Sequence, residues 1–279
     1  MGSAGAVRRG RLAKALVIGA ALVTVGLAYG VLLPGDATGA ASGNGPQSDQ
    51  IDAGRRLFAV GCSSCHGLHA EGGTNGAGRV AGPSLIGVGA AAVDFQVSTG
   101  RMPAAQTNAQ IPQKPPVYNQ QEIDALAAYV ASLAPGPAVP AAESYDVSKV
   151  TQAEIARGGE LFRTNCTACH NFAGRGGALP NGRYAPSLMG TTPRNIYQAM
   201  LTGPQQMPVF SDSVLLPEDK RAIIAYIVAL QQQKDPGGFP LGRLGPVSEG
   251  LWGWVFGIGL LVLVAVWIGA KVPRIRRPR

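Results

Sequence analysis

The sequence of 279 residues predicts an all-α protein: two tandem helical units with a transmembrane helix before and after them. Three observations predict this fold. A cysteine–histidine motif and its surroundings occur twice, a helical hydrophobic pattern closes each copy, and two long apolar runs carry no charge. The expected segments are a basic tail (1–14), a transmembrane helix or signal anchor (15–33), a linker (34–50), a first unit (51–133), a linker (134–150), a second unit (151–231), a linker (232–250), a transmembrane helix (251–270) and a basic tail (271–279).

The first apolar run, 15–33, contains nineteen residues without a charge. At about 1.5 Å per residue, a helix of this length reaches roughly 30 Å, which is the thickness of the membrane hydrocarbon core. A cleaved signal peptide ending near 37–41 is the alternative. The run is long for the apolar part of such a peptide, so a retained anchor is favoured.

A Cys-x-x-Cys-His motif occurs at 62–66 and again at 166–170. This motif attaches a c-type haem: two thiols bond to the haem and the histidine ligates its iron. Two such cysteine pairs could instead form a four-thiolate zinc site, two redox pairs or two disulfides, but none of these explains a histidine after both pairs. We therefore expect two covalently bound haem c groups, attached at Cys62, Cys65, Cys166 and Cys169, with His66 and His170 as axial ligands.

The surroundings of the two motifs repeat at an offset close to 104, which indicates an internal duplication. The corresponding residues include Gly54 and Gly158, Phe58 and Phe162, Pro83 and Pro186, and Met102 and Met207. Amphipathic helices at 122–133 and 217–230 close the two copies. Neither copy has enough apolar side chains for a large core, and a covalent haem would supply the missing part.

Met102 and Met207 are the expected sixth ligands of the two irons. They lie 36 and 37 residues after their haem histidines, and a proline follows each of them. A neutral thioether raises the reduction potential of a haem relative to a second imidazole. Of the other methionines of the second unit, Met200 is expected in the core and Met189 on the histidine side of the haem.

Several further polar residues lie near the motifs. His69 is too close to His66 to reach the opposite face of the haem, so we expect a solvated loop histidine. The segment 104–119 makes the first unit longer than the second and is either a partner contact or a neutral insertion. Candidates for binding haem carboxylates, as an alternative to a plain surface role, are Arg79, Arg101, Arg183 and Tyr184.

Each unit resembles a class I cytochrome c domain over residues 50–133 and 153–231. The resemblance rests on Cys-x-x-Cys-His, then Pro-Ser-Leu, then Met-Pro, and then a helix with tyrosine and leucine. It implies that the carbonyl groups of Pro83 and Pro186 accept hydrogen bonds from His66 and His170. Such a bond would fix the orientation of the ring and raise its basicity.

The second apolar run, 251–270, contains twenty uncharged residues, with tryptophans near both ends that suit a membrane interface. Nine basic residues and no acidic residue lie in the two tails, whereas the region between them has fifteen basic and sixteen acidic residues. The formal charge of +8 therefore reflects the tails. It predicts a cell-membrane protein with cytoplasmic tails and outward haem units, and no nucleic-acid binding.

Taken as a whole, the chain resembles the dihaem cytochrome c subunit of the actinobacterial menaquinol–cytochrome c reductase, the bcc complex. The two motifs, the C-terminal anchor and the basic tail carry this resemblance. It implies that electrons pass from a Rieske iron–sulfur centre through both haems to an aa-type oxidase. The reductase (translocase) activity would belong to the complex, without a catalytic residue in this chain. Implied partners are the cytochrome b subunit, the Rieske subunit, the oxidase and the lipid membrane, in a dimeric assembly.

Three other classes of protein also carry two c-type haems or serve as electron carriers. The dihaem subunit of a cbb-type oxidase is anchored at its N-terminus, so the C-terminal helix argues against it. A dihaem cytochrome c peroxidase needs an open sixth position on one haem, whereas both units offer a methionine. A free membrane-anchored shuttle differs from the favoured class only in its partners.

Overall fold

A computed structural model describes residues 17–22, 24, 46–74, 76, 78, 80–106, 108, 110–234, 243 and 250–271. Several expected segments lie wholly or mostly outside these residues: the basic tails, the 15–33 span, and the linkers 34–50 and 232–250. Arg79 also lies outside them. Contacts divide the chain into residues 1–44 and 45–279, which are described separately. Within residues 1–44, residues 17–22 are helical and exposed.

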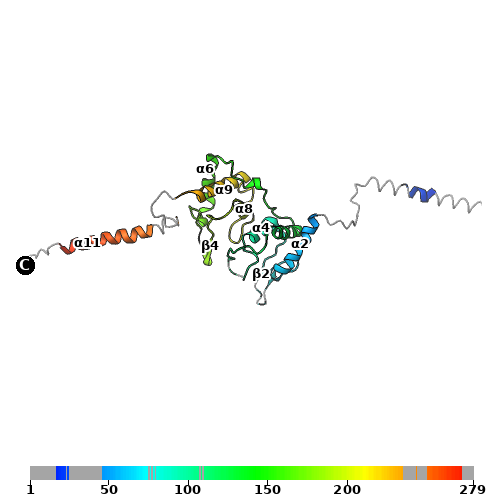
Figure 1. Ribbon diagram of the computed structural model, residues 1–279, viewed down its shortest axis with the longest axis horizontal. Helices are drawn as coiled ribbons and strands as arrows, with labels where there is room; N and C mark the ends of the chain where they lie inside the picture. Colours follow the sequence, from blue (N-terminus) through cyan, green and yellow to red (C-terminus); the bar gives the residue numbers. More distant parts are fainter. Residues whose placement is uncertain are drawn as a thin grey trace, which may run out of the picture. The chain divides into compact units, whose positions relative to one another are not determined.

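Helices dominate the described part of residues 45–279 (Figure 1). Its earlier elements are α2 (Pro46–Gly61), α3 (Ser63–His66), β1 (Gly73–Thr74), β2 (Val80–Gly82), α4 (Gly89–Ser98) and α5 (Gln120–Leu133). Its later elements are η1 (Ala142–Ser144), α6 (Gln152–Asn165), α7 (Thr167–His170), β3 (Gly177–Leu179), η2 (Pro180–Gly182), β4 (Arg183–Ala185), α8 (Pro193–Thr202), α9 (Pro217–Gln232), η4 (Gly253–Ile258) and α11 (Gly259–Lys271). Because α2 begins at Pro46, the end of the expected 34–50 linker is helical.

Two short antiparallel ribbons, β1–β2 and β3–β4, interrupt the helical fold in the glycine-rich stretches after the motifs. The fold is mostly helical as predicted, whereas the ribbons were not predicted, because strands of two or three residues show no periodicity in the sequence. The first ribbon lies directly on the haem motif. A Cβ atom would lie 2.7 Å from the Cys65 carbonyl oxygen at Gly73 and 2.8 Å from it at Gly82, so glycine is required there.

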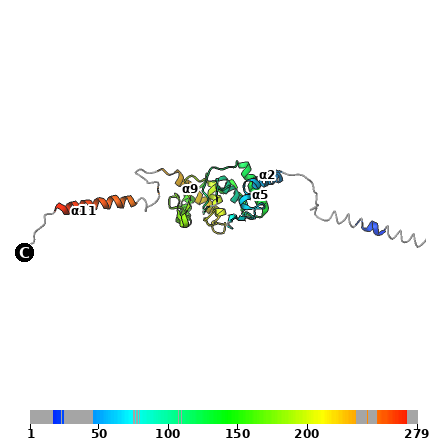
Figure 2. The same ribbon diagram turned by 90° about the horizontal axis from the view of Figure 1, so that it is seen from below.

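In each half, the helix before the motif packs against the last helix, α2 against α5 (Figure 2) and α6 against α9. Glycines allow the close approach. A Cβ atom at Gly54 would lie 2.0 Å from the Ala125 carbonyl oxygen, and one at Gly158 would lie 1.9 Å from that of Ala222. The prediction that both glycines occupy corresponding places in a duplicated unit thus has a physical basis in helix–helix contact.

Aromatic pairs lie beside both of these helix crossings. The ring centroids of Phe58 and Tyr129 are 5.2 Å apart, and those of Phe162 and Tyr226 are 5.5 Å apart. Tilted pairs at this distance are favourable beyond their burial. They belong to two separate hydrophobic clusters, one in each half, with Cys62 and Met102 at the margin of the first and Cys166 and Met207 at the margin of the second.

Local capping explains where two of these helices begin. Asn119 precedes α5 and forms reciprocal hydrogen bonds with Glu122, and Thr151 precedes α6 and does the same with Glu154. Such capping boxes satisfy backbone amides that lack partners inside the helix. They start α5 two residues earlier than the hydrophobic pattern predicts.

The two halves meet where α4 packs against α8. At their contact, Asp94 is fully buried and accepts hydrogen bonds from Gln198 Nε2 and, at 2.8 Å, from Arg194 Nη2. Gln120 Nε2 also donates to this carboxylate at 3.3 Å. A buried carboxylate needs such donors, because removing one partner leaves an uncompensated charge. Asp94 and Gln198 are 104 residues apart, so the contact joins corresponding positions of the two repeats.

Within the described residues, one helix is long and apolar enough to cross a membrane, Gly250–Ala270. It includes the π-helical segment η4 and continues into α11, and its side chains are largely exposed. It coincides with the predicted 251–270 span. An exposed apolar helix of about this length suits a lipid environment, since in water its surface would be unfavourable.

Candidate haem-binding sites

Each haem motif forms a single helical turn, α3 in the first half and α7 in the second. The amide groups of His66 and His170 donate to the carbonyl groups of Cys62 and Cys166 at 3.0 and 2.9 Å. One turn of helix brings residues three and four apart onto one face, which gathers both cysteines and the histidine of each motif. The chain then turns away through positive φ angles at Gly67 and Asn171.

Both motif histidines have the same partner, a proline carbonyl on the following loop. Nδ1 of His66 lies 2.8 Å from the carbonyl oxygen of Pro83, and Nδ1 of His170 lies 3.0 Å from that of Pro186. A carbonyl oxygen only accepts, so the proton of each neutral ring is on Nδ1 and the Nε2 lone pair is available for a metal. Burial lowers the pKa of His170, opposed by its bond to Pro186, which favours this neutral form.

The four cysteines are free thiols, a finding that does not support the disulfide alternative. Burial, with a smaller contribution from the neighbouring Cys65, raises the pKa of Cys62 to about 11. The pKa of Cys166 is raised to about 11 for the same reason, with Cys169 as the neighbour. The first thiol of each motif is thus neutral at physiological pH and lies within an apolar environment.

A cavity of about 580 Å³ brings the predicted ligands of the second half together. Cys166, Cys169, His170 and Met207 all line it. Its apolar wall includes Phe162, one isoleucine of α8 and two of α9: Ile196, Ile223 and Ile227. Cofactor pockets have volumes of about 300–1,000 Å³ and are mostly apolar with a few polar groups. The donor set and the cavity therefore fit a covalently attached haem.

The two other methionines of the second half, Met189 and Met200, occupy different places from Met207. Met200 also reaches the cavity wall, from the buried face of α8, and is only 2% exposed. Met189 lies against Gly174. Met207 lies on the loop between α8 and α9, and its amide donates to the Pro204 carbonyl at 3.1 Å. In the first half, the Met102 amide donates to the Gln96 carbonyl at 2.9 Å.

The remaining candidates lie either at the surface or in the cavity that holds the predicted ligands of the second half, which is called the second cavity from here on. His69 is exposed, and its backbone amide donates to the Glu71 carboxylate at 2.8 Å. Arg183 and Tyr184 line the second cavity. So does Arg101, although it precedes Met102 in the first half. The sequence did not predict that residues of the first half line the cavity of the second half, because no spacing pattern reports contacts between the two halves. Besides Arg101, the first-half residues that line this cavity are Phe95, Thr99, Gln110, Ile111 and Gln113.

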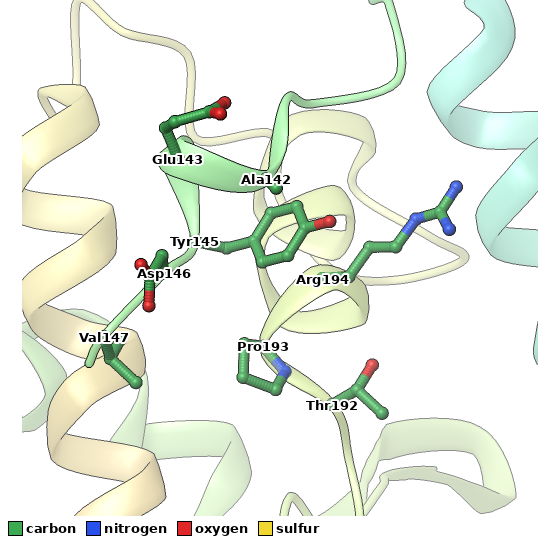
Figure 3. A pocket seen from close by; sticks show the side chains of 8 residues that line it. All are labelled: Ala142, Glu143, Tyr145, Asp146, Val147, Thr192, Pro193 and Arg194. Carbon is green, nitrogen blue, oxygen red and sulfur yellow. The ribbon is translucent and has the colours of Figure 1, made fainter.

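A further cavity of about 460 Å³ lies beside η1 and the start of α8 (Figure 3). Its lining residues are Ala142, Glu143, Tyr145, Asp146, Val147, Thr192, Pro193 and Arg194. They include no cysteine, histidine or methionine, so this cavity does not fit a haem. Figure 3 shows Arg194 pointing away from Glu143 and Asp146, in agreement with its bond to Asp94.

Comparisons with known proteins agree with the two motifs. The family described as "Cytochrome c" matches residues 51–134, and the family described as "Cytochrome C oxidase, cbb3-type, subunit III" matches residues 153–227. A more distant match is the "Cbb3-type cytochrome c oxidase subunit FixP" of Rhizobium meliloti, which is 32% identical and covers 30% of this chain and 32% of the relative.

Two much closer relatives are both named "Cytochrome bc1 complex cytochrome c subunit". The protein of Corynebacterium efficiens is 42% identical, and the match covers 96% of this chain and 94% of the relative. That of Mycobacterium tuberculosis is 43% identical and covers 94% of this chain and 92% of the relative. The chain therefore belongs to the family of cytochrome bc1 complex cytochrome c subunits and is an electron-transfer cytochrome c.

Proposed function

We propose that this chain carries two covalent haem c groups in tandem cytochrome c domains, 51–133 and 151–231, and conducts electrons out of a quinol-oxidising complex. The observation that carries the proposal is the cavity shared by Cys166, Cys169, His170 and Met207. The duplicated motif and the matching His66–Pro83 bond extend the same proposal to the first half. When bound, a haem supplies one-electron redox chemistry.

The residues of each half have separate tasks in this proposal. The cysteines of each motif would anchor the haem, and His66 and His170 would offer Nε2 to the iron. Pro83 and Pro186 hold those rings in place and fix their tautomer. Met102 and Met207 would provide the thioether ligands. None of these groups transfers protons or binds quinol, so the chain is a carrier within the translocase rather than its catalytic subunit.

We further propose that the chain connects a Rieske iron–sulfur subunit and a cytochrome b subunit to a terminal aa-type oxidase in a dimeric assembly. The names of its relatives, which place them in a bc1 complex, support the first two partners. The apolar helix Gly250–Ala270 and the nine basic residues of the tails support a membrane protein with both tails in the cytoplasm. The 15–33 segment would be a second anchor.

Purification of the tagged chain in mild detergent tests this function. A reduced-minus-oxidised spectrum, taken with menaquinol as reductant, should contain b-type and a-type bands beside the c-type bands. A preparation with only c-type bands and no reduction by quinol would contradict the assignment to a reductase–oxidase assembly. Turnover of hydrogen peroxide by that preparation would then indicate a peroxidase.

Replacing both cysteines of one motif, Cys166→Ala with Cys169→Ala, should remove one of two haems per chain. The intact mass should fall by one haem beyond the change of side chains, and the haem content per polypeptide should halve. Ser64→Ala, a change at an exposed position between the cysteines of the first motif, is the control and should keep both haems. An unchanged haem content in the double variant would refute covalent attachment at this motif.

A further inference from the structure

The second cavity has one wall that belongs to the first half of the chain. Phe95 reaches it from α4, which packs against α8. Arg101, Gln110 and Ile111 reach it from the loop between α4 and α5. The pocket is therefore built from both repeats.

Two glutamine side chains hold this loop on the second half. Gln110 donates to the Tyr184 carbonyl at 2.7 Å and accepts from the Tyr184 amide at 2.8 Å. Gln205, from the second half, does the same to Ile111 at 3.1 Å in both directions. Each amide group thus pairs with the backbone as a neighbouring strand would. The segment 104–119 was expected to be either a partner contact or a neutral insertion. Part of it forms a contact within the chain.

Arg101 belongs to this wall and has no acidic partner among the residues that the structure describes. Its guanidinium lies over the Phe95 ring, 5.1 Å from the centroid, and none of the described carboxylates forms an ion pair with it. A partly buried cation is unfavourable without a counter-charge. A haem brings two carboxylates, and the planar guanidinium matches their geometry.

We propose that Arg101, a residue of the first half, binds a carboxylate of the haem in the second half, so that docking of the two repeats completes the second haem site. This inference rests on the proposed function. Arg101 and Met102 are consecutive residues that would then serve different haems. A cation held at the haem edge favours the ferrous state over the ferric state by Coulomb attraction.

The test is a potentiometric titration of the full-length chain with both haems attached, comparing Arg101→Gln with the wild type. The Met207→Leu variant first identifies which wave belongs to the second haem. Arg101→Gln should lower the ferrous-to-ferric ratio of that haem three- to tenfold at a fixed potential, tenfold being 59 mV for one electron. The first haem should keep its potential. Arg101→Lys should retain part of the effect, and Arg56→Gln, at an exposed site on α2, should change neither haem.

Other outcomes separate this inference from the proposed function. A shift of the first haem alone, or of neither haem, would overturn the role of Arg101 while leaving two methionine-ligated haems in place. If Arg101→Gln lowers haem content, the loss should fall on the second motif alone, as mapped by mass spectrometry of haem peptides; loss at the first motif would overturn the inference. A wild-type chain with fewer than two haems would instead contradict the proposed function.

Discussion

Gly158→Ala is expected to prevent α6 from packing on α9 and to deplete the second haem. The added Cβ atom would lie 1.9 Å from the carbonyl oxygen of Ala222, which belongs to helix backbone and cannot rotate away. Overpacking of this kind costs about 1–3 kcal/mol and occasionally more, which exceeds the gain of up to about 1 kcal/mol from the higher helix propensity of alanine. The free energy of unfolding and the haem content per chain measure the effect.

The adjacent glycine provides a matched control for this substitution. In Gly159→Ala the added Cβ atom would lie 3.0 Å from a side-chain carbon of Tyr226, and a side chain can shift. This variant should therefore remain close to the wild type in stability and haem content. Gly54→Ala should reproduce the defect in the first half, where the Ala125 carbonyl oxygen would be 2.0 Å away. Equal stability of Gly158→Ala and Gly159→Ala would show that the helix crossing tolerates a side chain.

Met207→Leu is expected to lower the reduction potential of the second haem and to open its iron to carbon monoxide. Leucine keeps the volume of the methionine side chain but has no sulfur to stabilise ferrous iron. The ferrous-to-ferric ratio at a fixed potential should fall at least about tenfold, roughly 59 mV for one electron. A potentiometric titration and a spectrum under carbon monoxide measure both effects, and Met102→Leu should do the same at the first haem.

Met200→Leu is the control for the ligand assignment, since it makes the same change at another residue that lines the same cavity. Met200 is 2% exposed and packs among the apolar residues of α8 and α9. Its replacement by leucine should leave the potential and the carbon monoxide response unchanged, with a small effect on stability. If Met200→Leu lowered the potential and Met207→Leu did not, Met200 would be the ligand.

The helices that bear a strong hydrophobic stripe were predicted closely. The end of α5 at Leu133 and the start of α9 at Pro217 are as expected, and the bounds elsewhere differ by one or two residues. By contrast, α4 was not predicted as a helix. Its sequence is rich in alanine and valine with no polar face, because both of its sides are covered, one by α5 and one by α8. A helix buried on both sides shows no amphipathic period.

The sequence by itself determined the chemistry proposed for this protein, because thiol attachment and histidine ligation would require residues at short, fixed spacings along one chain. It also determined the duplication, the terminal apolar runs and the charge of the tails. Only the tertiary structure decided how the repeats meet. The burial of Asp94 between α4 and α8, the pairing of Gln110 with Tyr184, and the presence of Arg101 in the second cavity are contacts between residues 74 to 104 positions apart or between different repeats. Such contacts depend on the packing of whole helices, for which local spacing and periodicity carry no information.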